Sequence, residues 1–455
     1  MDRRSFVQAG AFSLAAGWKF PEWMEARAHA LPSPSPAQLA WQREELAMFL
    51  HFGVNTFTDR EWGDGREAPA IFDPARLDAR QWARTARAAG FRALILTAKH
   101  HDGFCLWPTA TTRHSVASSP WRGGAGDVVR EFIDACAAEG LRAGLYLSPW
   151  DRNHPTYGDT PAYNDVYAAQ LTELLTRYGR ITEVWFDGAN GEGPTGRRQV
   201  YDWPRVFGLV RRLQPEAVIF SDAGPDVRWC GNERGVAGDP NWSPVDPKVV
   251  SFPGQSGSGI EAALQHGHQD GTVWRPAEVD VSIRPGWFYH PAQDARVRTV
   301  DNLLELYFTS VGRNSKLLLN VPPTREGLIH EIDAARLLGF RTRRDELFGE
   351  SIGLRRVELR RGGREGAGAE WELRRAAAPR IARLSEDITR GQRVAAYRLE
   401  GLQDGQWRPL SAGTTIGYAK LDRIPSGAPL SRVRLVIEKS VDQPEPVSLQ
   451  LFERA

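Results

Sequence analysis

Two acidic residues, Asp187 and Glu233, are candidates for a catalytic pair because each lies at the end of a segment expected to lead to a ligand site. Asp187 closes the apolar segment Val184-Trp185-Phe186-Asp187-Gly188, and Glu233 closes an aromatic-rich polar segment that begins at Arg228. A pair of carboxylates flanking a glycosidic bond is the usual machinery for hydrolysing it. The two residues therefore indicate glycoside hydrolysis, provided that the fold brings them to one pocket.

Further polar and aromatic residues recur where buried strands are expected to end. Neutral histidines both donate and accept hydrogen bonds, which suits sugar hydroxyls, and aromatic side chains suit the apolar faces of sugar rings, although aromatics also fill cores. Ligands of parallel α/β proteins bind at the carboxyl ends of the strands. The candidate binding residues are His51, Glu61, Trp62, His100, His101, Tyr146, Trp185, Arg228 and Trp287.

The elements that must position these residues alternate between short apolar runs and helical segments from Ala47 to Gly339. Such alternation is typical of parallel strands covered by helices, and about eight units favour a (β/α)8-type barrel over an open sheet. The expected strands cover residues 48–50, 91–99, 141–147, 181–187, 217–220, 279–283 and 316–320. The expected helices cover residues 73–90, 128–139, 165–178, 203–213 and 297–309.

Capping residues set the expected helix ends. Asp73 followed by Pro74, Asp127 and Asn164 are suitable first residues, because their side chains accept hydrogen bonds from free amides of the first helical turn. Gly140 is a suitable stop. Residues 252–273 are rich in Gly, Ser and His without an apolar period, so we expect a long loop over the active face.

The pattern changes after Glu350, where apolar and polar residues alternate with a period of two. This alternation predicts antiparallel strands, and turn signals such as Asp404-Gly405 separate them. We expect a β-sandwich over residues 350–455, acting as a structural cap or a carbohydrate-binding module, after a catalytic domain over residues 31–345.

The N-terminus has the form of a twin-arginine export signal over residues 1–30. Arg3 and Arg4 precede a modest apolar run, and Ala28-His29-Ala30 has the small-x-small form of a cleavage site. An amphipathic helix is the alternative interpretation. The apolar run is too short to span a bilayer, and no later segment looks transmembrane. The signal predicts a protein exported in the folded state and located in the periplasm or secreted.

Composition limits the choice of partners. The 455 residues carry a net charge of only +2, with acidic and basic side chains interleaved, which does not favour nucleic acid. The three cysteines, Cys105, Cys136 and Cys230, have no metal-binding spacing and form no disulfide framework, although Cys105 and Cys230 could pair. The oligomeric state is not indicated.

From about residue 42 to residue 340 the chain resembles an α-L-fucosidase of glycoside hydrolase family 29. The motifs that carry the resemblance are His51-Phe52-Gly53-Val54-Asn55-Thr56-Phe57, Lys99-His100-His101-Asp102-Gly103-Phe104, Tyr146-Leu147-Ser148 and Trp185-Phe186-Asp187-Gly188, in the family's order. The resemblance implies retaining hydrolysis with Asp187 as nucleophile. It also implies a fucose subsite lined by His51, Glu61, Trp62, His100, His101, Tyr146, Trp185 and Arg228.

Two further segments resemble the subgroup that acts on α-1,3- and α-1,4-linked fucosyl branches. They are residues 228–233, which place the acid/base at Glu233, and residues 280–290. The subgroup implies Lewis-type substrates, whose galactose needs a second subsite at the loop before Trp274 and at Glu278 or Asp280. Fucose carries a methyl group, so an apolar wall is expected from Trp62, Trp185 and Trp287.

Two other classes of function remain as alternatives. His51, His100, His101 and Asp187 are all metal-ligand types, which would suit a metal-dependent hydrolase on a barrel. Adjacent strand residues point to opposite faces, so His100 and His101 are not expected to share an ion, and we expect no metal and no cofactor. A non-catalytic fucose-binding barrel is the second alternative, and the presence of both carboxylates counts against it.

Overall fold

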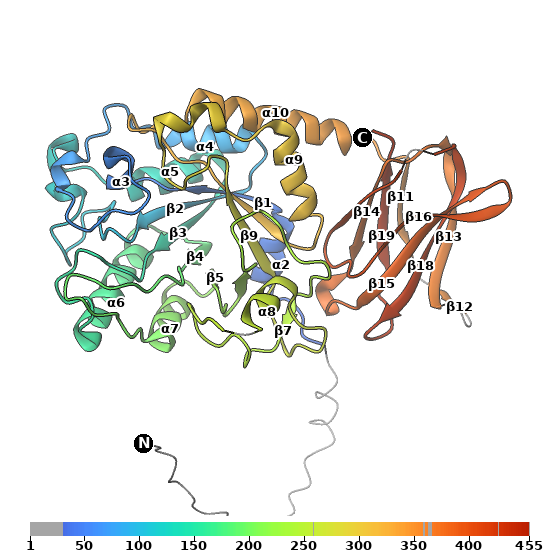
Figure 1. Cartoon of the computed structure of the whole chain (residues 1–455), viewed down its shortest axis with the longest axis horizontal. Helices are drawn as coiled ribbons and strands as arrows, with labels where there is room; N and C mark the ends of the chain where they lie inside the picture. The colour runs from blue at the N-terminus through green and yellow to red at the C-terminus, as the bar shows by residue number, and fades with distance from the viewer. Residues whose placement is uncertain (1–30, 258, 358–359, 363–365, 426, 455) are drawn as a thin grey trace, which may run out of the picture. The chain divides into compact units, whose positions relative to one another are not determined.

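Eight parallel strands close into a barrel in the computed structural model (Figure 1), which confirms the predicted fold. Around the barrel the strand order is β1-β10-β9-β6-β5-β4-β3-β2. The strands are β1 (Leu46–Leu50), β2 (Ala93–Lys99), β3 (Arg142–Leu147), β4 (Glu183–Trp185), β5 (Val218–Ser221), β6 (Val227–Trp229), β9 (Ala277–Ser282) and β10 (Lys316–Asn320).

The structure describes residues 31–257, 259–357, 360–362, 366–425 and 427–454. The predicted export signal over residues 1–30 and its cleavage site lie outside the described residues. Within the described part of the chain, no helix is both long and apolar enough to span a bilayer.

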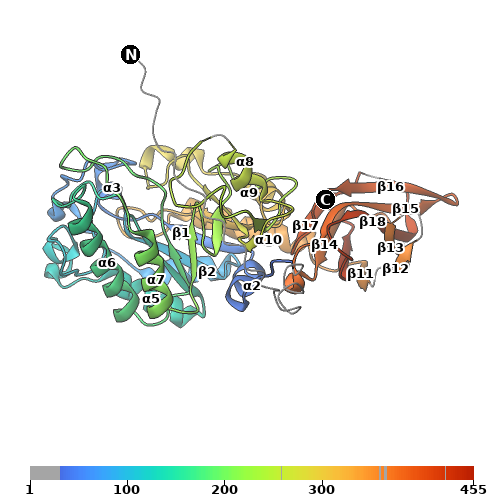
Figure 2. The ribbon, with the colours of Figure 1, turned by 90° about the horizontal axis from the view of Figure 1, so that it is seen from below.

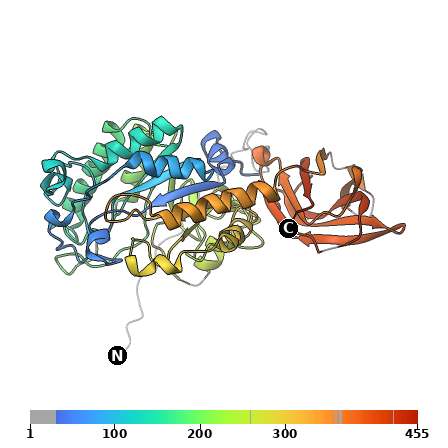
Figure 3. The same ribbon diagram turned by 90° about the horizontal axis from the view of Figure 1, so that it is seen from above.

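Helices cover the outside of the barrel, as Figures 1 and 2 show. In Figure 3 the long orange helix α10 runs along this outer surface, where it contacts α4. The helices are α2 (Pro36–Arg43), α3 (Val54–Thr58), α4 (Ala79–Ala88), α5 (Val128–Glu139), α6 (Thr160–Arg177), α7 (Trp203–Leu213), α8 (Ile260–His266), α9 (Val300–Thr309) and α10 (Glu331–Leu347).

Helix α5 has the ends that its sequence predicts. The Asp127 side chain accepts a hydrogen bond from the Arg130 amide at 2.9 Å, and Gly140 ends the helix with a left-handed φ of 66°. Helix α7 and strand β10 also match their predicted bounds. Local signals are enough to define these elements: capping residues for the two helices and an apolar run for the strand.

Two predicted helix starts are wrong by five residues or more, and α9 begins at Val300, three residues after its predicted start. Helix α4 begins after Asp78 and not at Asp73, because the preceding segment pairs instead with the loop after β10, where the Arg76 amide donates to the Glu326 carbonyl. Helix α6 begins after Asp159, five residues before the predicted start, and Asn164 lies inside it. Pro161, in its first turn, suits a helix start and was overlooked.

The connections around β5 and β6 depart from a regular eightfold repeat. No helix joins these two strands, and the short connection is held by Asp226, whose carboxylate accepts from the Ile219 amide at 2.7 Å. The predicted loop over residues 252–273 is also partly wrong, since it contains helix α8. Ile260, Ala263 and Leu264 of this segment pack into a small apolar cluster that their spacing had not indicated.

Beyond the barrel, two antiparallel sheets form the predicted β-sandwich. The four-stranded sheet has the order β11-β19-β14-β17 and the five-stranded sheet β12-β13-β18-β15-β16. One apolar core unites residues of both sheets, among them Leu384, Leu399, Leu435 and Leu449. The strands are β11 (Gly353–Val357), β12 (Arg360–Gly362), β13 (Gly366–Ala377), β14 (Ile381–Glu386), β15 (Val394–Gln403), β16 (Gln406–Gly413), β17 (Lys420–Arg423), β18 (Leu430–Ser440) and β19 (Val447–Phe452).

Candidate active site

A cavity of about 440 Å³ lies at the carboxyl ends of the barrel strands. The residues that line it come from the segments that end or follow β1, β2, β4, β6 and β9. Both predicted catalytic carboxylates and most predicted binding residues are among them. The lining residues are Phe49, His51, Glu61, Trp62, His100, His101, Trp185, Asp187, Ala189, Glu233, Asp280, Pro285, Gly286 and Trp287.

Asp187 follows strand β4 by two residues and is held by hydrogen-bond donors. The Tyr146 hydroxyl donates to Oδ2 at 3.1 Å, and the Ala189 amide donates to Oδ1 at 2.6 Å. His101 Nε2 lies 3.9 Å from Oδ2. Tyr146 thus belongs to the site through its contact with Asp187. The two donors, Tyr146 and Ala189, orient the carboxylate while a quarter of the side chain (26%) stays exposed.

Glu233 lies in the segment after β6 and lines the same cavity as Asp187. Burial raises the pKa of Glu233, and the charges of Asp187 and Glu61 raise it further, whereas the hydrogen bond from Trp287 Nε1 at 3.3 Å lowers it. The net effect is a raised pKa of Glu233. Glu233 therefore retains its proton to higher pH than an ordinary glutamate, which is what a general acid requires.

The hydrogen bonds of His51 define its tautomer. Asn320 Nδ2 donates to Ser282 Oγ and to the Trp287 carbonyl, so Asn320 Oδ1 is an acceptor and His51 Nδ1, 2.9 Å away, carries the proton. Burial lowers the pKa of His51 to about 3, so the ring is neutral. Its Nε2 is then an unprotonated acceptor for a hydroxyl group.

His101 has the same tautomer for a similar reason. Ser148 Oγ donates to the Trp150 carbonyl at 2.8 Å, so it accepts from His101 Nδ1 at 2.7 Å. Burial lowers the pKa of His101 and, more strongly, that of His100. The cavity thus presents neutral imidazoles to a substrate.

His100 and His101 both line the cavity, with ring centroids 4.1 Å apart, so the prediction that they point to opposite faces is wrong. Strand β2 ends at Lys99, and the alternation of side chains stops with the strand. Among the described residues, no group of three or more His, Cys, Asp or Glu side chains is arranged to hold a metal ion.

Glu61 and Trp62 lie in the long segment between β1 and α4. Glu61 accepts from the Trp287 amide at 2.8 Å and contacts His290 Nε2 at 2.7 Å, which ties this segment to the one after β9. Trp62 is 58% exposed and meets the rings of His101 and Trp150 edge-on. Both residues form the outer wall of the cavity.

Arg228 is the predicted binding residue that the structure does not bring to the cavity. It lies on β6 between Val227 and Trp229, which both face the barrel interior. Because side chains alternate along a strand, Arg228 points outward, where it donates to the carbonyls of Leu264 and Arg275 and to Asn241.

Asp280 and Glu278 of β9 were expected only as a galactose subsite, and the structure places Asp280 in the catalytic cavity itself. Asp280 lines the cavity and accepts from Trp229 Nε1 at 2.7 Å, and burial together with the charge of Glu233 holds its pKa well above the usual range. Glu278 lies deeper and accepts from Trp185 Nε1 at 3.0 Å. Acidic residues alternating with Ala277, Val279 and Val281 were the available signal, because such residues face the barrel interior.

The three cysteines are free and buried, so the possible pairing of Cys105 with Cys230 does not occur in this structure. Cys230 Sγ contacts the Asn232 carbonyl, and Cys105 Sγ contacts the Gly103 carbonyl. Cys105 and Cys230 lie in different segments that follow barrel strands, and Cys136 is buried in helix α5.

A closed parallel barrel whose strand ends hold two carboxylates among histidines and tryptophans defines the class of barrel glycoside hydrolases. Comparisons with known proteins narrow this class. The family model described as alpha-L-fucosidase matches residues 10–341. The chain therefore belongs to the α-L-fucosidase family, glycoside hydrolase family 29.

Individual relatives agree with this assignment. Alpha-L-fucosidase 1 of Arabidopsis thaliana is 43% identical over 444 residues, covering 91% of this chain and 86% of the relative. A glycoside hydrolase 29 family member from an unknown rumen bacterium has a TM-score of 0.86 and 39% identity, covering 94% of this chain and 78% of that one. A fucosidase of the same family from Ruminococcus gnavus, solved in complex with fucose, has a TM-score of 0.83 and 30% identity, covering 93% and 95%.

Proposed function

We propose that this protein is an exo-acting, retaining α-L-fucosidase that releases terminal α-1,3- or α-1,4-linked L-fucose from branched, Lewis-type oligosaccharides or glycoconjugates. The observation that carries the activity is the placement of Asp187 and Glu233 in one cavity lined by neutral histidines and tryptophans. Family membership and the fucose complex of the Ruminococcus gnavus relative support the choice of sugar.

In this mechanism Asp187 attacks the anomeric carbon and forms a covalent glycosyl ester, while Glu233 gives its proton to the departing oxygen. Glu233, now a carboxylate, then takes a proton from water, which attacks the anomeric carbon and releases fucose and Asp187. The raised pKa of Glu233 supports its role as the acid. The donors from Tyr146 and Ala189 support Asp187 as the oriented nucleophile.

The other cavity residues would bind the fucosyl unit. The free Nε2 atoms of His51 and His101 suit sugar hydroxyl donors, as does the Glu61 carboxylate. Trp62, Trp185 and Trp287 offer apolar surface for the methyl group. Arg228 has no part in this proposal, because its guanidinium group is bound on the outer side of β6.

The linkage preference rests on the resemblance of residues 228–233 and 280–290 to the branch-specific subgroup. Of the two acidic residues considered for a galactose subsite, Asp280 lines the cavity, whereas Glu278 is fully buried beneath Trp185. Asp280 is therefore the better candidate to contact the acceptor side of the substrate.

Product analysis tests the proposal. The purified protein is incubated separately with a Lewis-type α-1,3/1,4-fucosylated trisaccharide, an α-1,2-fucosylated lactose and an aryl fucoside. Fucose released mainly from the branched trisaccharide is the expected result. Release from only the α-1,2 or aryl substrate would retain the activity and overturn the linkage, and fucose from none of them would favour the non-catalytic or metal-dependent alternatives.

We also propose export to the periplasm or cell exterior through the twin-arginine-type signal. Arg3 and Arg4 support it, together with the small-x-small sequence that ends at Ala30. Replacing both arginines by lysine should leave the protein in the cytoplasmic fraction of a host with this pathway. Unchanged export would contradict the assignment.

A further inference from the structure

His290, a residue to which the proposed mechanism assigns no role, lies between two carboxylates beside the catalytic cavity. Its Nδ1 lies 2.8 Å from Asp59 Oδ1, and its Nε2 lies 2.7 Å from Glu61 Oε1. Both acids follow α3, whereas His290 lies in the segment that follows β9. The imidazole ring therefore joins two segments that are far apart in the sequence.

The two contacts of His290 depend on the protons of its ring. An ionised carboxylate only accepts hydrogen bonds, and a neutral imidazole carries a single N–H, so the neutral ring can donate to one of the acids but not to both. Both contacts are made when both ring nitrogens are protonated. The positive charge then lies between Asp59 and Glu61, and Arg325, 3.7 Å from Asp59, supplies a second one.

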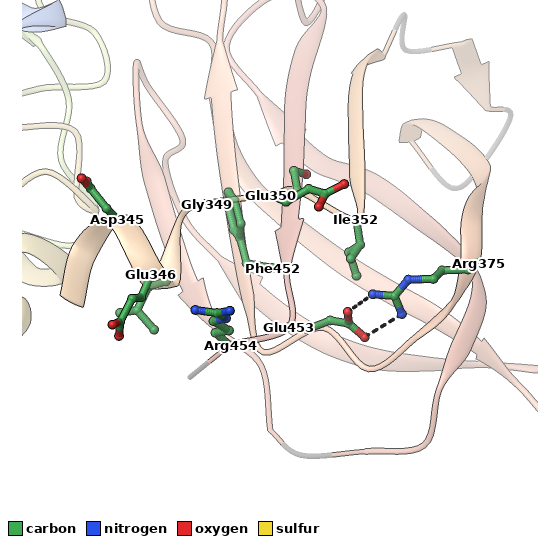
Figure 4. Close-up of a pocket in the computed structure, with 11 residues that line it drawn as sticks. Asp345, Glu346, Gly349, Glu350, Ile352, Arg375, Phe452, Glu453 and Arg454 are labelled. Carbon is green, nitrogen blue, oxygen red and sulfur yellow. Dashed lines mark hydrogen bonds and ion pairs between the residues drawn. The ribbon is translucent and has the colours of Figure 1, made fainter. Parts of the chain in front are cut away.

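The ring of His290 is largely sheltered from solvent, with 12% of its side chain exposed. A cavity of about 530 Å³ near the end of α10 shows the contrast (Figure 4), since Glu453 there pairs with Arg375, whose side chain is 61% exposed. Exposed pairs of that kind contribute little, because water screens them. A largely buried charge depends more strongly on its partners, so the contacts of His290 are better suited to fix a geometry.

Glu61 is held through both of its carboxylate oxygens. Oε1 contacts His290 Nε2, and Oε2 accepts from the Trp287 amide at 2.8 Å. Gly286 leaves room for this approach, because a Cβ at that position would collide with Oε1. Since Glu61 lines the catalytic cavity and His290 lies behind it, the ring sets the orientation of a carboxylate in the cavity wall.

The same contacts lead to the proposed general acid. Trp287 carries both the amide that donates to Glu61 and the indole that donates to Glu233 Oε2 at 3.3 Å. The Trp287 carbonyl accepts from Asn320 Nδ2 at 2.8 Å, so its backbone is held on both sides. His290 is thus connected to Glu233 through Glu61 and Trp287.

We propose that His290 is a positioning residue of the catalytic site. Through Nε2 it holds Glu61, and through Glu61 it holds the backbone of Trp287, so that the indole N–H stays directed at Glu233. The inference rests on the proposed function, in which Glu233 is the acid and Glu61 binds the fucosyl unit. It gives His290 an effect on both turnover and sugar binding, although the ring itself does not line the cavity.

Two neutral substitutions distinguish the two ring nitrogens. In His290→Gln the side-chain amide nitrogen can take the place of Nε2 and keep the contact with Glu61, whereas in His290→Asn it can take the place of Nδ1 and keep only the contact with Asp59. On an aryl fucoside, His290→Asn should lose about tenfold or more in kcat/KM, because a misplaced catalytic site is costly. His290→Gln should stay within about threefold of wild type. Equal losses in both variants, or wild-type activity in His290→Asn, would overturn the inference.

A double-variant cycle shows whether His290 acts through Glu61. In a Glu61→Gln background the additional loss caused by His290→Asn should shrink to within about threefold, because the group that His290 positions is already changed. A purely structural effect of His290→Asn would instead multiply the loss of Glu61→Gln in full, and this result would contradict the proposed role. Urea denaturation confirms that each variant is folded.

A binding measurement separates failure of this inference from failure of the proposed activity. L-Fucose is titrated into wild type, His290→Gln and His290→Asn by calorimetry. Weaker binding to His290→Asn alone supports the positioning role even if no fucoside is hydrolysed, and equal binding to the three proteins contradicts it. Absence of fucose binding to wild type would overturn the proposed function, and this inference with it.

Discussion

At the scale of single residues, the proposed reaction depends most on Asp187. Asp187→Ala removes the atom that would bond to the anomeric carbon, so kcat should fall by several orders of magnitude for every fucoside. The side chain is partly exposed, so the unfolding midpoint should change little. Steady-state kinetics and urea denaturation measure the two effects, and Asp187→Asn is the isosteric control. Near wild-type turnover in either variant would contradict the nucleophile assignment.

If Glu233 is the general acid, the effect of replacing it should depend on how much the leaving group needs protonation. Without a proton donor, Glu233→Ala should lose the most kcat/KM on oligosaccharides, whose leaving alcohols need protonation, and the least on aryl fucosides with acidic phenols. A series of aryl fucosides of decreasing phenol acidity measures this dependence. An equal loss across the series would mean that Glu233 only binds substrate.

The pH dependence of activity follows from the environment of Glu233. The Trp287 N–H stabilises the charged carboxylate, so Trp287→Phe should raise the pKa of Glu233 further. Because the acid must be protonated, activity is lost as pH rises through this pKa, and the basic limb of kcat/KM should move to higher pH. Trp62→Phe removes an indole from the same cavity and should leave the limb in place. A limb that moves down or does not move in Trp287→Phe would refute the assignment.

At the scale of elements, the sequence was most informative where a strand or helix is defined by its own residues. Strand β10 and helix α5 have the bounds that apolar runs and caps predict, because those signals are local. Asp73 was a plausible cap, yet pairing with a distant loop gave that role to Asp78. Such competition between distant segments leaves no trace in a local pattern.

The candidate site was predictable to the extent that its residues follow strand ends. His51, His100 and Asp187 do so, and each lines the cavity. The prediction that Arg228 lines the cavity is wrong, because the orientation of its side chain depends on where β6 begins and on which face of β6 is turned to the barrel interior. The alternation along β9 indicated that Glu278 faces the interior, but its contact with Trp185 was hidden, since that requires the register of β9 against its neighbours.

The register of β9 places a buried acid beneath the site, and this supports a prediction about Trp185. Burial and the neighbouring Glu183 hold the pKa of Glu278 well above the usual range, so it is a neutral acceptor for Trp185 Nε1. Glu278→Gln should keep near wild-type kinetics. Glu278→Leu leaves the indole N–H unpaired, which should cost about 1–3 kcal/mol of unfolding free energy and lower kcat/KM. Denaturation and kinetics of the two variants check this, and equal behaviour of both would contradict it.

At the scale of the whole molecule, a buried polar network joins the β-sandwich to the barrel. Gln392, next to the sandwich strands, accepts from the Ser243 amide at 2.8 Å and donates to the Asn241 carbonyl at 3.0 Å. Asn314 accepts from the Tyr418 amide at 2.9 Å. Lys420 forms an ion pair with Asp239 at 2.6 Å. Since buried backbone groups of the barrel find their partners in the sandwich, the structural-cap interpretation is favoured over an independent sugar-binding module.

Gln392→Ala tests whether this network stabilises the protein. The change leaves the buried Ser243 amide and Asn241 carbonyl without the partner that Gln392 supplied, so the free energy of unfolding should fall by about 2–4 kcal/mol. Arg423→Ala is the matched control, because it breaks a pair with Glu305 of α9 whose side chains are about half exposed, and should cost less than about 1 kcal/mol. Urea denaturation measures both variants.

Since neither residue lines the catalytic cavity, kcat/KM on an aryl fucoside should remain unchanged while the variants are folded. A Gln392→Ala protein as stable as the Arg423→Ala control would mean that water replaces the lost bonds and that the two parts are held together elsewhere.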